Sequence, residues 1–539
     1  MTAWATNTPP TSNSELHMGA MARAYVEGDV LSRFLRSESR SLLYTSGPDD
    51  QQSSMHARGA KAGDEASGEN RDSYGPSIVR VSRSLGVPLD QVILPRRGTG
   101  HAGEVQRFFR RLYDEGCITA LTKRLPYCVA CERWLYEAYV VGRCPHCEAY
   151  SNGHACEACG RPSDCGDLGD AECALCGQAA EYRLCERLYF PLSPYAERLA
   201  AYWGAVRMTP HLRRLCDLMA ADGLPDIAIT HPADCGVNVP VAGFEDQRIS
   251  VCFEMAYGYV LKAGQRSGIR AEHSWPVHFF DLDNGYLHAV LFPALYAALG
   301  LTDSSANAFQ IKEFHGLRRQ GFSTDRRHIV WADQVIKSCG SDVLRNHVCS
   351  GQFEGWQTSP DLSALEGTHQ HLDALWNGWL HGLFDTVEAE CGGRVPWDEP
   401  AGEDWKALRV KLLSSLAELR EAFGPALFAP HRAVTLLDRM VRYVTDFAHV
   451  QAYQAQHMGC HAQRRAAYAA QLAVASAMAA WTAPVMPVGA ARLAEVLGLP
   501  TDRPVTAAAL EVPRRGRRLV RLDGPVFGSL PDYASVDGE

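Results

Sequence analysis

Four pairs of cysteines share the spacing Cys-x-x-Cys within one short stretch of the chain. Zinc prefers thiolate ligands, and a structural zinc ion takes four in a tetrahedron. Eight thiolates therefore predict two structural Zn²⁺ sites, and neither is expected to be catalytic because four cysteines leave no open position. Gly160 and Gly177 directly follow two of the pairs, as in knuckle turns. The predicted metal ligands are Cys128, Cys131, Cys144, Cys147, Cys156, Cys159, Cys173 and Cys176. Spacing alone leaves open which pairs share an ion.

The remaining cysteines do not suggest a disulfide framework. The chain has 18 cysteines, ten of them between Cys128 and Cys185, and its first residues lack the basic and apolar regions of a secretory signal. Cysteines in such a chain point to metal binding or to scattered core thiols. We interpret His154, Cys165 and Cys185 as bystanders of the metal sites.

Composition indicates an ordinary globular protein with room for two to four domains. The 539 residues are 46% hydrophobic and 21% charged, and 62 acidic against 53 basic residues give a net charge of −9. This balance argues against a dedicated basic nucleic-acid binder. The apolar stretch 467–488 is rich in alanine and holds two prolines, which favours a buried helix over a membrane span. We expect a soluble, cytoplasmic protein with no membrane partner.

Strands and helices alternate in the part of the chain that precedes the cysteines. An apolar strand, a loop rich in Pro, Ser and Asn, a helix over 17–36 and a strand at 41–47 predict a parallel α/β sheet. An amphipathic helix follows at 104–116. After the cysteines we expect further helix to about residue 224, and helices again from about 365 onward. Strands are expected at 226–232, 248–255 and 275–283, with a helix at 285–299.

Four blocks resemble the methionyl-tRNA synthetase family in the same order along the chain. They are "PPTSNSELHMGA" at 9–20, the cysteine pairs, "ITHPADCGVNVP" at 229–240 and "HFFDLDNGYLHAVLFPAL" at 278–295. The resemblance implies a class I synthetase fold: an α/β, Rossmann-like catalytic domain, an inserted connective peptide with zinc knuckles, and a C-terminal α-helical bundle. It also implies nested zinc sites, with the pairs at 144 and 156 inside those at 128 and 173.

The resemblance implies an ATP-dependent ligase that activates an amino acid. In this family the substrate carboxylate attacks the α-phosphate of ATP, and the protein holds the reactants in line and stabilises the phosphate charge. His17 and Gly19 match the H-I-G-H signature and are candidates for ATP binding and catalysis. Asp283 matches the residue near the ribose, and Ser323 and Arg326 are catalytic candidates in the second signature. The candidate amino-acid-binding residues are Pro9, Asp49, Cys252, Tyr259, His288 and Phe292, of which Asp49 would bind the ammonium group.

Departures from the family pattern affect both the phosphate signatures and the pocket. Ala20 replaces the second histidine of the first signature, and Gly321 and Thr324 stand where the second signature, K-M-S-K-S, has lysines. Around the substrate side chain, Cys252 stands where the family has a tryptophan, as do Cys235 and Phe292. Loss of this aromatic lining changes the pocket volume, so the amino acid is expected not to be methionine.

The C-terminal region matches the family less well. The block "DVLRNHV" at 342–348 resembles D-x-L-R-Y-Y, but His381 and Asp385 stand where the family has an Asn and an Arg that read the anticodon. An aspartate there would repel an RNA backbone. The arginines of 514–518 are interpreted as a solvated basic run, with contact to RNA as the alternative.

We expect five segments: residues 1–116, the first half of the catalytic domain; 117–224, the connective peptide; 225–330, the second half; 331–365, a linker that resembles the stem-contact region; and 366–539, a helical domain that resembles the anticodon-binding domain.

Three functions stay open. The favoured one is transfer of an activated amino acid to a small-molecule acceptor in specialised metabolism, as in hydrazine synthetases, which would require a separate cupin-type partner. The others are a genuine methionine–tRNA ligase, for which tRNA is the acceptor, and a non-catalytic nucleotide- or tRNA-binding paralogue. ATP with Mg²⁺ and an amino acid are the expected substrates, and a monomer is expected.

Overall fold

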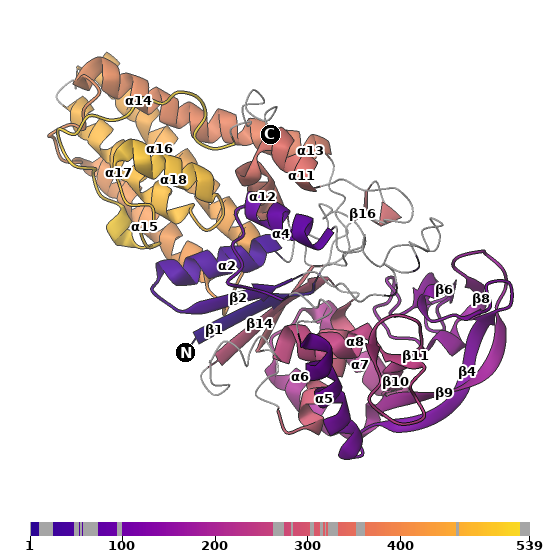
Figure 1. Cartoon of the computed structure of the whole chain (residues 1–539). Coiled ribbons are helices and arrows are strands. Elements are labelled where there is room, and N and C mark those ends of the chain that lie inside the picture. The colour runs from indigo at the N-terminus through magenta and orange to yellow at the C-terminus, as the bar shows by residue number, and fades with distance from the viewer. Residues whose placement is uncertain are drawn as a thin grey trace.

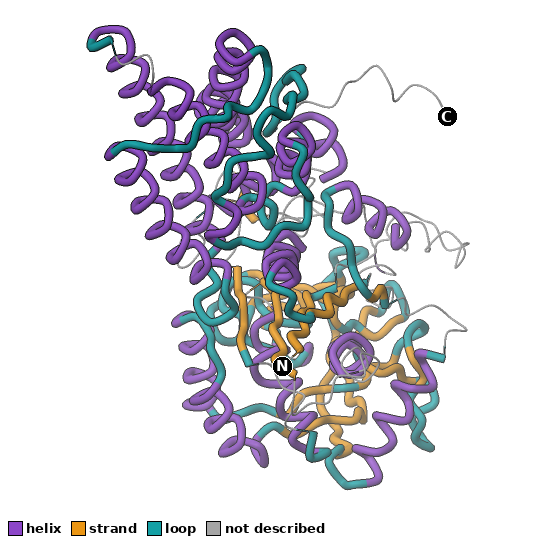
Figure 2. The backbone as a smooth tube through the Cα atoms, turned by 90° about the vertical axis from the view of Figure 1, so that its left-hand side faces the viewer, coloured by secondary structure: helices purple, strands orange, loops and turns teal. Residues whose placement is uncertain are grey.

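The computed structural model describes most of the chain and places its parts in two connected bodies (Figure 1). The described residues are 2–9, 25–47, 53, 57, 74–93, 100–261, 274–281, 284–301, 307–312, 316–317, 320–321, 332–351, 362–459 and 463–528. Figure 2 shows the C-terminal helices, in purple, stacked above the orange strands of the central sheet.

A five-stranded sheet lies at the centre of the molecule, in the order β15-β14-β1-β2-β3, and every paired edge is parallel. Strands β2 and β3 follow β1 on one side of the sheet, and β14 and β15, which come later in the chain, lie on the other side of β1. In open sheets of this kind, ligands bind at the carboxyl ends of the strands where the order reverses, here between β1 and β14. The strands are β1 (Thr2–Asn7), β2 (Leu42–Ser46), β3 (Gln91–Val92), β14 (Ser274–Asp281) and β15 (Ala308–Lys312).

Helices cover this sheet because each carries one apolar face. In α5 the buried residues are spaced three, one and three residues apart from Val105 to Leu112, which places them on one side of the helix. The described helices of the catalytic body are α2 (Val26–Ser37), α4 (Tyr74–Ser84), α5 (His101–Asp114), α6 (Ala196–Ala205), α7 (Pro210–Asp222), α8 (Val251–Met255) and α10 (Phe292–Ala298). A π-helical segment extends α8 over Ala256–Leu261, and a second, Leu287–Leu291, precedes α10.

A module inserted between β3 and β14 carries the cysteine pairs. Its long antiparallel pair, β4 and β9, belongs to a sheet of order β10-β9-β4-β5, and two small sheets of order β7-β6-β8 and β11-β13-β12 complete it. The strands are β4 (Thr119–Cys128), β5 (Arg133–Trp134), β6 (Glu137–Arg143), β7 (Tyr150–Gly153), β8 (Gly169–Cys173), β9 (Glu181–Pro191), β10 (Asp226–Ala228), β11 (Thr230–Pro232), β12 (Val237–Asn238) and β13 (Gln247–Ile249). A hairpin of β16 (Gly316–Leu317) and β17 (Gln320–Gly321) lies apart from it in sequence.

The prediction of a strand at 248–255 is wrong for most of these residues. Only β13 is extended there; after Ser250, the backbone turns into α8. All five residues of α8 are buried, so the apolar run shows neither the two-residue alternation of a half-exposed strand nor the polar face of a surface helix. The correction matters because it places Cys252 on a helix.

The C-terminal region is helical, as expected, and is joined to the sheet domain by a buried ion pair. Arg345 on α12 and Asp29 on α2 are both fully buried, with Nη2 and Oδ2 2.7 Å apart. Arg345 also donates from Nε to the carbonyl of Val485, at 2.7 Å. The helices are α11 (Ala332–Cys339), α12 (Ser341–Ser350), α13 (Leu362–His371), α14 (Gly378–Cys391), α15 (Glu403–Phe423), α16 (Pro430–His457), α17 (Arg464–Trp481) and α18 (Pro487–Leu497).

No helix among the described residues combines the length and the apolar character needed to cross a membrane.

Candidate functional site

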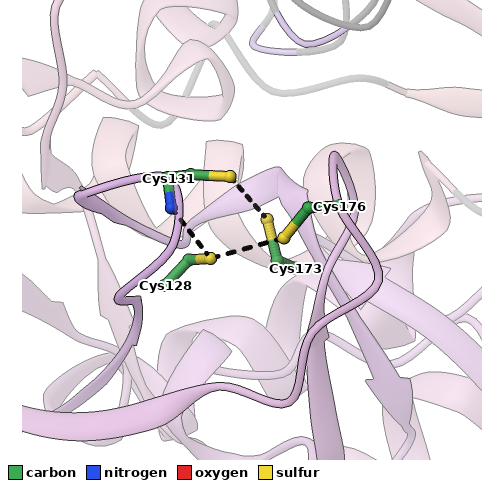
Figure 3. Close-up of side chains that lie close together, drawn as sticks. All are labelled: Cys128, Cys131, Cys173 and Cys176. Carbon is green, nitrogen blue, oxygen red and sulfur yellow. Dashed lines mark hydrogen bonds between the residues drawn. The ribbon is translucent and has the colours of Figure 1, made fainter.

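The outer pairs of cysteines meet at the open end of the inserted module (Figure 3). Cys128 ends β4 and Cys173 ends β8, and a tight turn follows each strand and brings back the second cysteine of its pair. The Sγ atoms of Cys128 and Cys176 are 3.5 Å apart, and those of Cys131 and Cys173 are 3.9 Å apart. All four sulfur atoms lie within 4.8 Å of one another.

The inner pairs form a second cluster with the same geometry. The sulfur atoms of Cys144 and Cys159 are 3.8 Å apart, and those of Cys147 and Cys156 are 3.6 Å apart. The eight cysteines therefore gather in the nested arrangement that the resemblance implies, with two groups of four.

Both clusters fit the size of a zinc ion. Zn–S bonds of about 2.3 Å in a tetrahedron place the sulfur atoms about 3.8 Å apart, close to the separations found here. Backbone amides approach the sulfur atoms, with the N–H of Cys131 donating to Sγ of Cys128 at 3.4 Å. Gly160 and Gly177 have φ of 74° and 75°, a conformation that favours glycine and lets each turn close.

Three of the predicted amino-acid-binding residues lie near the switch point of the central sheet. Pro9 follows the end of β1 and is buried. The adjacent Thr8 hydroxyl lies 3.1 Å from Nε2 of His288, which brings these segments together. His288 stacks on Phe280, with ring centres 4.3 Å apart, and contacts the edge of Phe292.

His288 is held in its neutral form. Its Nδ1 lies 3.1 Å from Nδ1 of His278, so one ring donates the proton and the other accepts it. Burial, aided by His278, lowers the pKa of His288 well below its usual value, and burial lowers the pKa of His278 to about 3. The His278–His288 pair therefore adds no positive charge to this part of the structure.

Cys252 lies on α8 and is linked to the same region through Tyr286, two residues before His288. The Tyr286 hydroxyl donates to Sγ of Cys252 at 3.5 Å, and Nδ1 of His154 lies 3.5 Å from the same sulfur. The backbone of Tyr259 belongs to the π-helical extension of α8. Gly258 lets that segment approach α5, because a Cβ atom there would lie 2.5 Å from Cε1 of His101.

The other predicted residues lie outside the described residues. These are His17, Gly19, Asp49, Asp283, Ser323 and Arg326. Their assignment stays a prediction.

Sequence reasoning missed a polar cluster beside Cys252. The Glu137 carboxylate is buried; its Oε2 lies 3.5 Å from Nε2 of His154 and its Oε1 lies 3.6 Å from Nε2 of His231. Ser250 donates to Oε1 at 3.2 Å. Burial by itself raises the pKa of Glu137, but the two imidazoles outweigh it and lower that pKa below its usual value.

Glu137, His154, His231, Ser250, Cys252 and Tyr286 share the wall of a cavity of about 790 Å³ between the inserted module and the catalytic body. A cavity of this volume is in the range that holds small ligands. The sequence marks His154 only as a bystander of the zinc site, and no spacing in the sequence links Glu137 to Cys252. The residues come from β6, a loop, β11, α8 with its N-cap, and the start of the π-helical segment before α10, so only the fold brings them together.

This architecture, a parallel sheet interrupted by a cysteine-rich module and followed by a helical region, defines a class I synthetase-like protein. A family model described as tRNA synthetases class I (M) matches residues 4–358. The chain belongs to this family of methionyl-type class I aminoacyl-tRNA synthetases.

Relatives and solved structures agree with this family. The methionine–tRNA ligase of Bacillus cereus strain AH187 is 28% identical over 403 residues, covering 72% of this chain and 73% of the relative. That of Thermomicrobium roseum is 28% identical over 418 residues, covering 73% and 69%. The structure of Mycobacterium tuberculosis methionyl-tRNA synthetase in complex with methionyl-adenylate matches with a TM-score of 0.80 at 20% identity, covering 98% of this chain and 100% of that one.

Proposed function

We propose that this chain activates an amino acid other than methionine with ATP, as an aminoacyl-adenylate, and transfers the acyl group to a small-molecule acceptor. The first half of the reaction follows from the family, whose relatives are named methionine–tRNA ligases. The choice of amino acid and acceptor rests on what this chain places around the pocket.

One feature supports the proposal: Cys252, which the sequence resemblance matches to a tryptophan of the family, places a thiol on the wall of the cavity. Its sulfur contacts a phenol and an imidazole, and it opens onto a cavity with a buried carboxylate. A thioether side chain gains its affinity from apolar and aromatic contacts, and polar groups left unpaired against it cost affinity. A wall of this kind favours a substrate with polar groups.

The proposed activation step requires little covalent chemistry from the protein itself. The substrate carboxylate attacks the α-phosphate of ATP, which enters with Mg²⁺, and pyrophosphate leaves. We assign His17, Gly19 and Asp283 to ATP, Ser323 and Arg326 to the phosphates, and Asp49 to the substrate ammonium group. The neutral His278–His288 pair lies beside Thr8 and Phe292 and adds no charge there.

The eight clustered cysteines would hold two Zn²⁺ ions. A closed four-thiolate site offers no position for substrate, so zinc would stabilise the module and not take part in the reaction. Because the cavity lies against this module, the metal sites would fix one wall of it.

The deciding experiment is amino-acid-dependent ATP–pyrophosphate exchange with each of the common amino acids, with and without tRNA. We expect exchange with an amino acid other than methionine, no acylation of tRNA, and formation of an amide or ester with a small amine, hydroxylamine or alcohol. Exchange with methionine alone, followed by charging of tRNA, would overturn the proposal.

A second candidate, a methionine–tRNA ligase, is favoured by the match over 72% of the chain and by the two intact cysteine clusters. The basic run offers it little support, because Arg515 pairs with Glu399 at 2.8 Å and Arg518 faces Glu388 at 3.8 Å. Nucleotide binding without any exchange would instead identify a non-catalytic paralogue. A hydrazine-synthetase-like role would be recognised by dependence on a separate cupin-type protein.

A further inference from the structure

Helix α8 is held by a buried polar contact near each of its ends. At its N-cap, the Ser250 hydroxyl donates to Oε1 of Glu137 at 3.2 Å. Toward its other end, Oε1 of Glu254 lies 2.7 Å from Nε2 of His101, which belongs to α5. All four residues are buried. Cys252 lies between the two contacts, so the inserted module and α5 together fix where its thiol stands on the cavity wall.

The hydroxyl of Ser250 does not have the usual role of an N-cap serine. Such a side chain ordinarily accepts a hydrogen bond from a backbone N–H in the first turn of its own helix. Ser250 accepts no such bond, and its hydroxyl donates instead to the Glu137 carboxylate on β6. Hydrogen bonds to a charged acceptor are among the stronger ones. The start of α8 is therefore held by a side chain of the module.

The backbone of the module is shaped to present Glu137 to α8. Its φ is 45°, which is uncommon for a residue other than glycine, and the pairing of β6 with β7 changes register between Glu137 and Val141. Irregularities of this kind redirect a side chain, and backbone strain clusters at functional sites. Gly153 allows the close approach, because a Cβ atom there would lie 2.8 Å from the backbone nitrogen of Glu137.

Glu137 is itself kept in place by a chain of polar side chains. Nε2 of His231 lies 3.6 Å from Oε1 of Glu137. On the other side of this imidazole, Arg187 donates to Nδ1 of His231 at 3.4 Å and to Oδ1 of Asp164 at 2.7 Å. Arg187 is fully buried, so its guanidinium depends on these partners. The carboxylate of Glu137 is therefore a fixed point from which α8 can be held.

We propose that Glu137 is a positioning residue for amino-acid selection. It acts through Ser250, holding the first turn of α8 and with it the thiol of Cys252, so that this wall keeps the shape that discriminates among amino acids. The wall adjoins the switch point of the sheet, because Tyr286, which donates to Cys252, lies two residues before His288. The inference rests on the proposed function, since selection is measured on the activation step.

The kinetic test uses the full, zinc-loaded chain and the amino acid that supports ATP–pyrophosphate exchange. Ser250→Ala and Glu137→Ala should each raise the KM for that amino acid by about 10-fold, with changes of less than about twofold in kcat and in the KM for ATP. The double variant should show no larger change than either single variant, because both substitutions break the same contact. Multiplied effects in the double variant, or an equal rise in the KM for ATP, would overturn the proposal.

A matched control separates positioning from a general loss of stability. Asp342→Ala alters a carboxylate that is as well buried as Glu137, at 5% exposure against 4%. This carboxylate accepts from the backbone N–H groups of Val488 and Gly489 in the helical region. The variant should lose stability and keep the KM for the amino acid. A rise in this KM as large as that of Glu137→Ala would overturn the positioning role.

A second measurement does not depend on catalysis. Alkylation by iodoacetamide, followed by peptide mass spectrometry, reports how well each cysteine is shielded. Cys252 is 5% exposed, and in Ser250→Ala it should react about 10-fold faster than in the natural chain. Cys216, which is buried on α7, should react at the same rate in both chains. An unchanged rate at Cys252, or an equal rise at Cys216, would overturn the proposal.

Failure of this inference and failure of the proposed function leave different results. Exchange with an unchanged amino-acid KM in Ser250→Ala would overturn the positioning role and leave the proposed function standing, whatever the alkylation rates. If no amino acid supports exchange, the proposed function fails, and alkylation of Cys252 then decides by itself whether Glu137 holds α8.

Discussion

The cysteine-rich module and the cavity beside it bring their polar side chains together in different ways. The module retains all eight cysteines in two clusters whose sulfur separations suit zinc. The cavity beside it has a thiol, Cys252, and a buried carboxylate with two imidazoles around it. The metal clusters are thus built from local cysteine pairs, whereas the polar cluster of the cavity joins residues from separate elements.

The largest effect is expected from breaking a metal cluster. Cys144→Ser should reduce the zinc content from two ions per chain to one and destabilise the module by on the order of 10 kcal/mol, because a structural zinc supplies folding free energy directly. Zinc content by mass spectrometry and thermal unfolding measure both effects. Cys185→Ser, a half-buried cysteine outside the clusters, should keep two ions; equal loss in both variants would refute the assignment.

A smaller loss of stability is expected when the buried carboxylate of Glu137 is replaced. Glu137→Gln should lower the free energy of unfolding by about 3 kcal/mol, since it removes one partner from a buried charged group. Urea unfolding measures the change. Glu148→Gln is the matched control, because this glutamate belongs to the same module and also has positive φ, but is exposed; it should change stability by less than about 0.5 kcal/mol.

Acid should lower the free energy of unfolding through protonation of His278. Its folded pKa of about 3 lies below the value of about 6.5 in an unfolded chain, so the unfolded state binds more protons between these values. The stabilisation is complete above pH 6.5 and decreases as the pH falls; at pH 5.5 about 1.4 kcal/mol should be lost. His278→Phe should lose less stability than the natural chain over the same pH step. Equal losses of unfolding free energy in the natural chain and in His278→Phe between pH 7.5 and 5.5, measured by urea unfolding, would contradict this.

The smallest effect on stability, with the clearest effect on specificity, is expected for Cys252→Trp. The adjoining cavity of about 790 Å³ can take up the added ring, so stability should change by less than about 1.5 kcal/mol. Because the indole restores an apolar wall, methionine-dependent ATP–pyrophosphate exchange should appear or increase. Cys252→Ala should not produce this gain, and a gain in both variants would show that the ring is irrelevant.

The same contrast explains what the sequence could reveal. Cysteine pairs and strand–helix order are local signals, so the metal ligands and the class I fold follow from spacing and from block order. The pocket cluster depends on contacts between residues up to 113 positions apart, such as Ser250 with Glu137, and no local pattern announces such contacts. The run Val251–Met255 looks like a strand in the sequence for a related reason: all of its side chains are buried, so hydrophobic periodicity cannot distinguish a helix from a strand there. The domain boundaries and the assignments of His17, Gly19 and Asp283 stay predictions.

The Arg345–Asp29 pair has a mechanical consequence. Its guanidinium also bonds to the carbonyls of Leu85, Pro484 and Val485, so one side chain fastens the sheet domain to two separate parts of the helical region. A rotation of one body against the other would have to separate this guanidinium from Asp29 and from the carbonyl of Leu85. The pair therefore couples α12 of the helical region directly to α2, which packs against β1 and β2 of the central sheet.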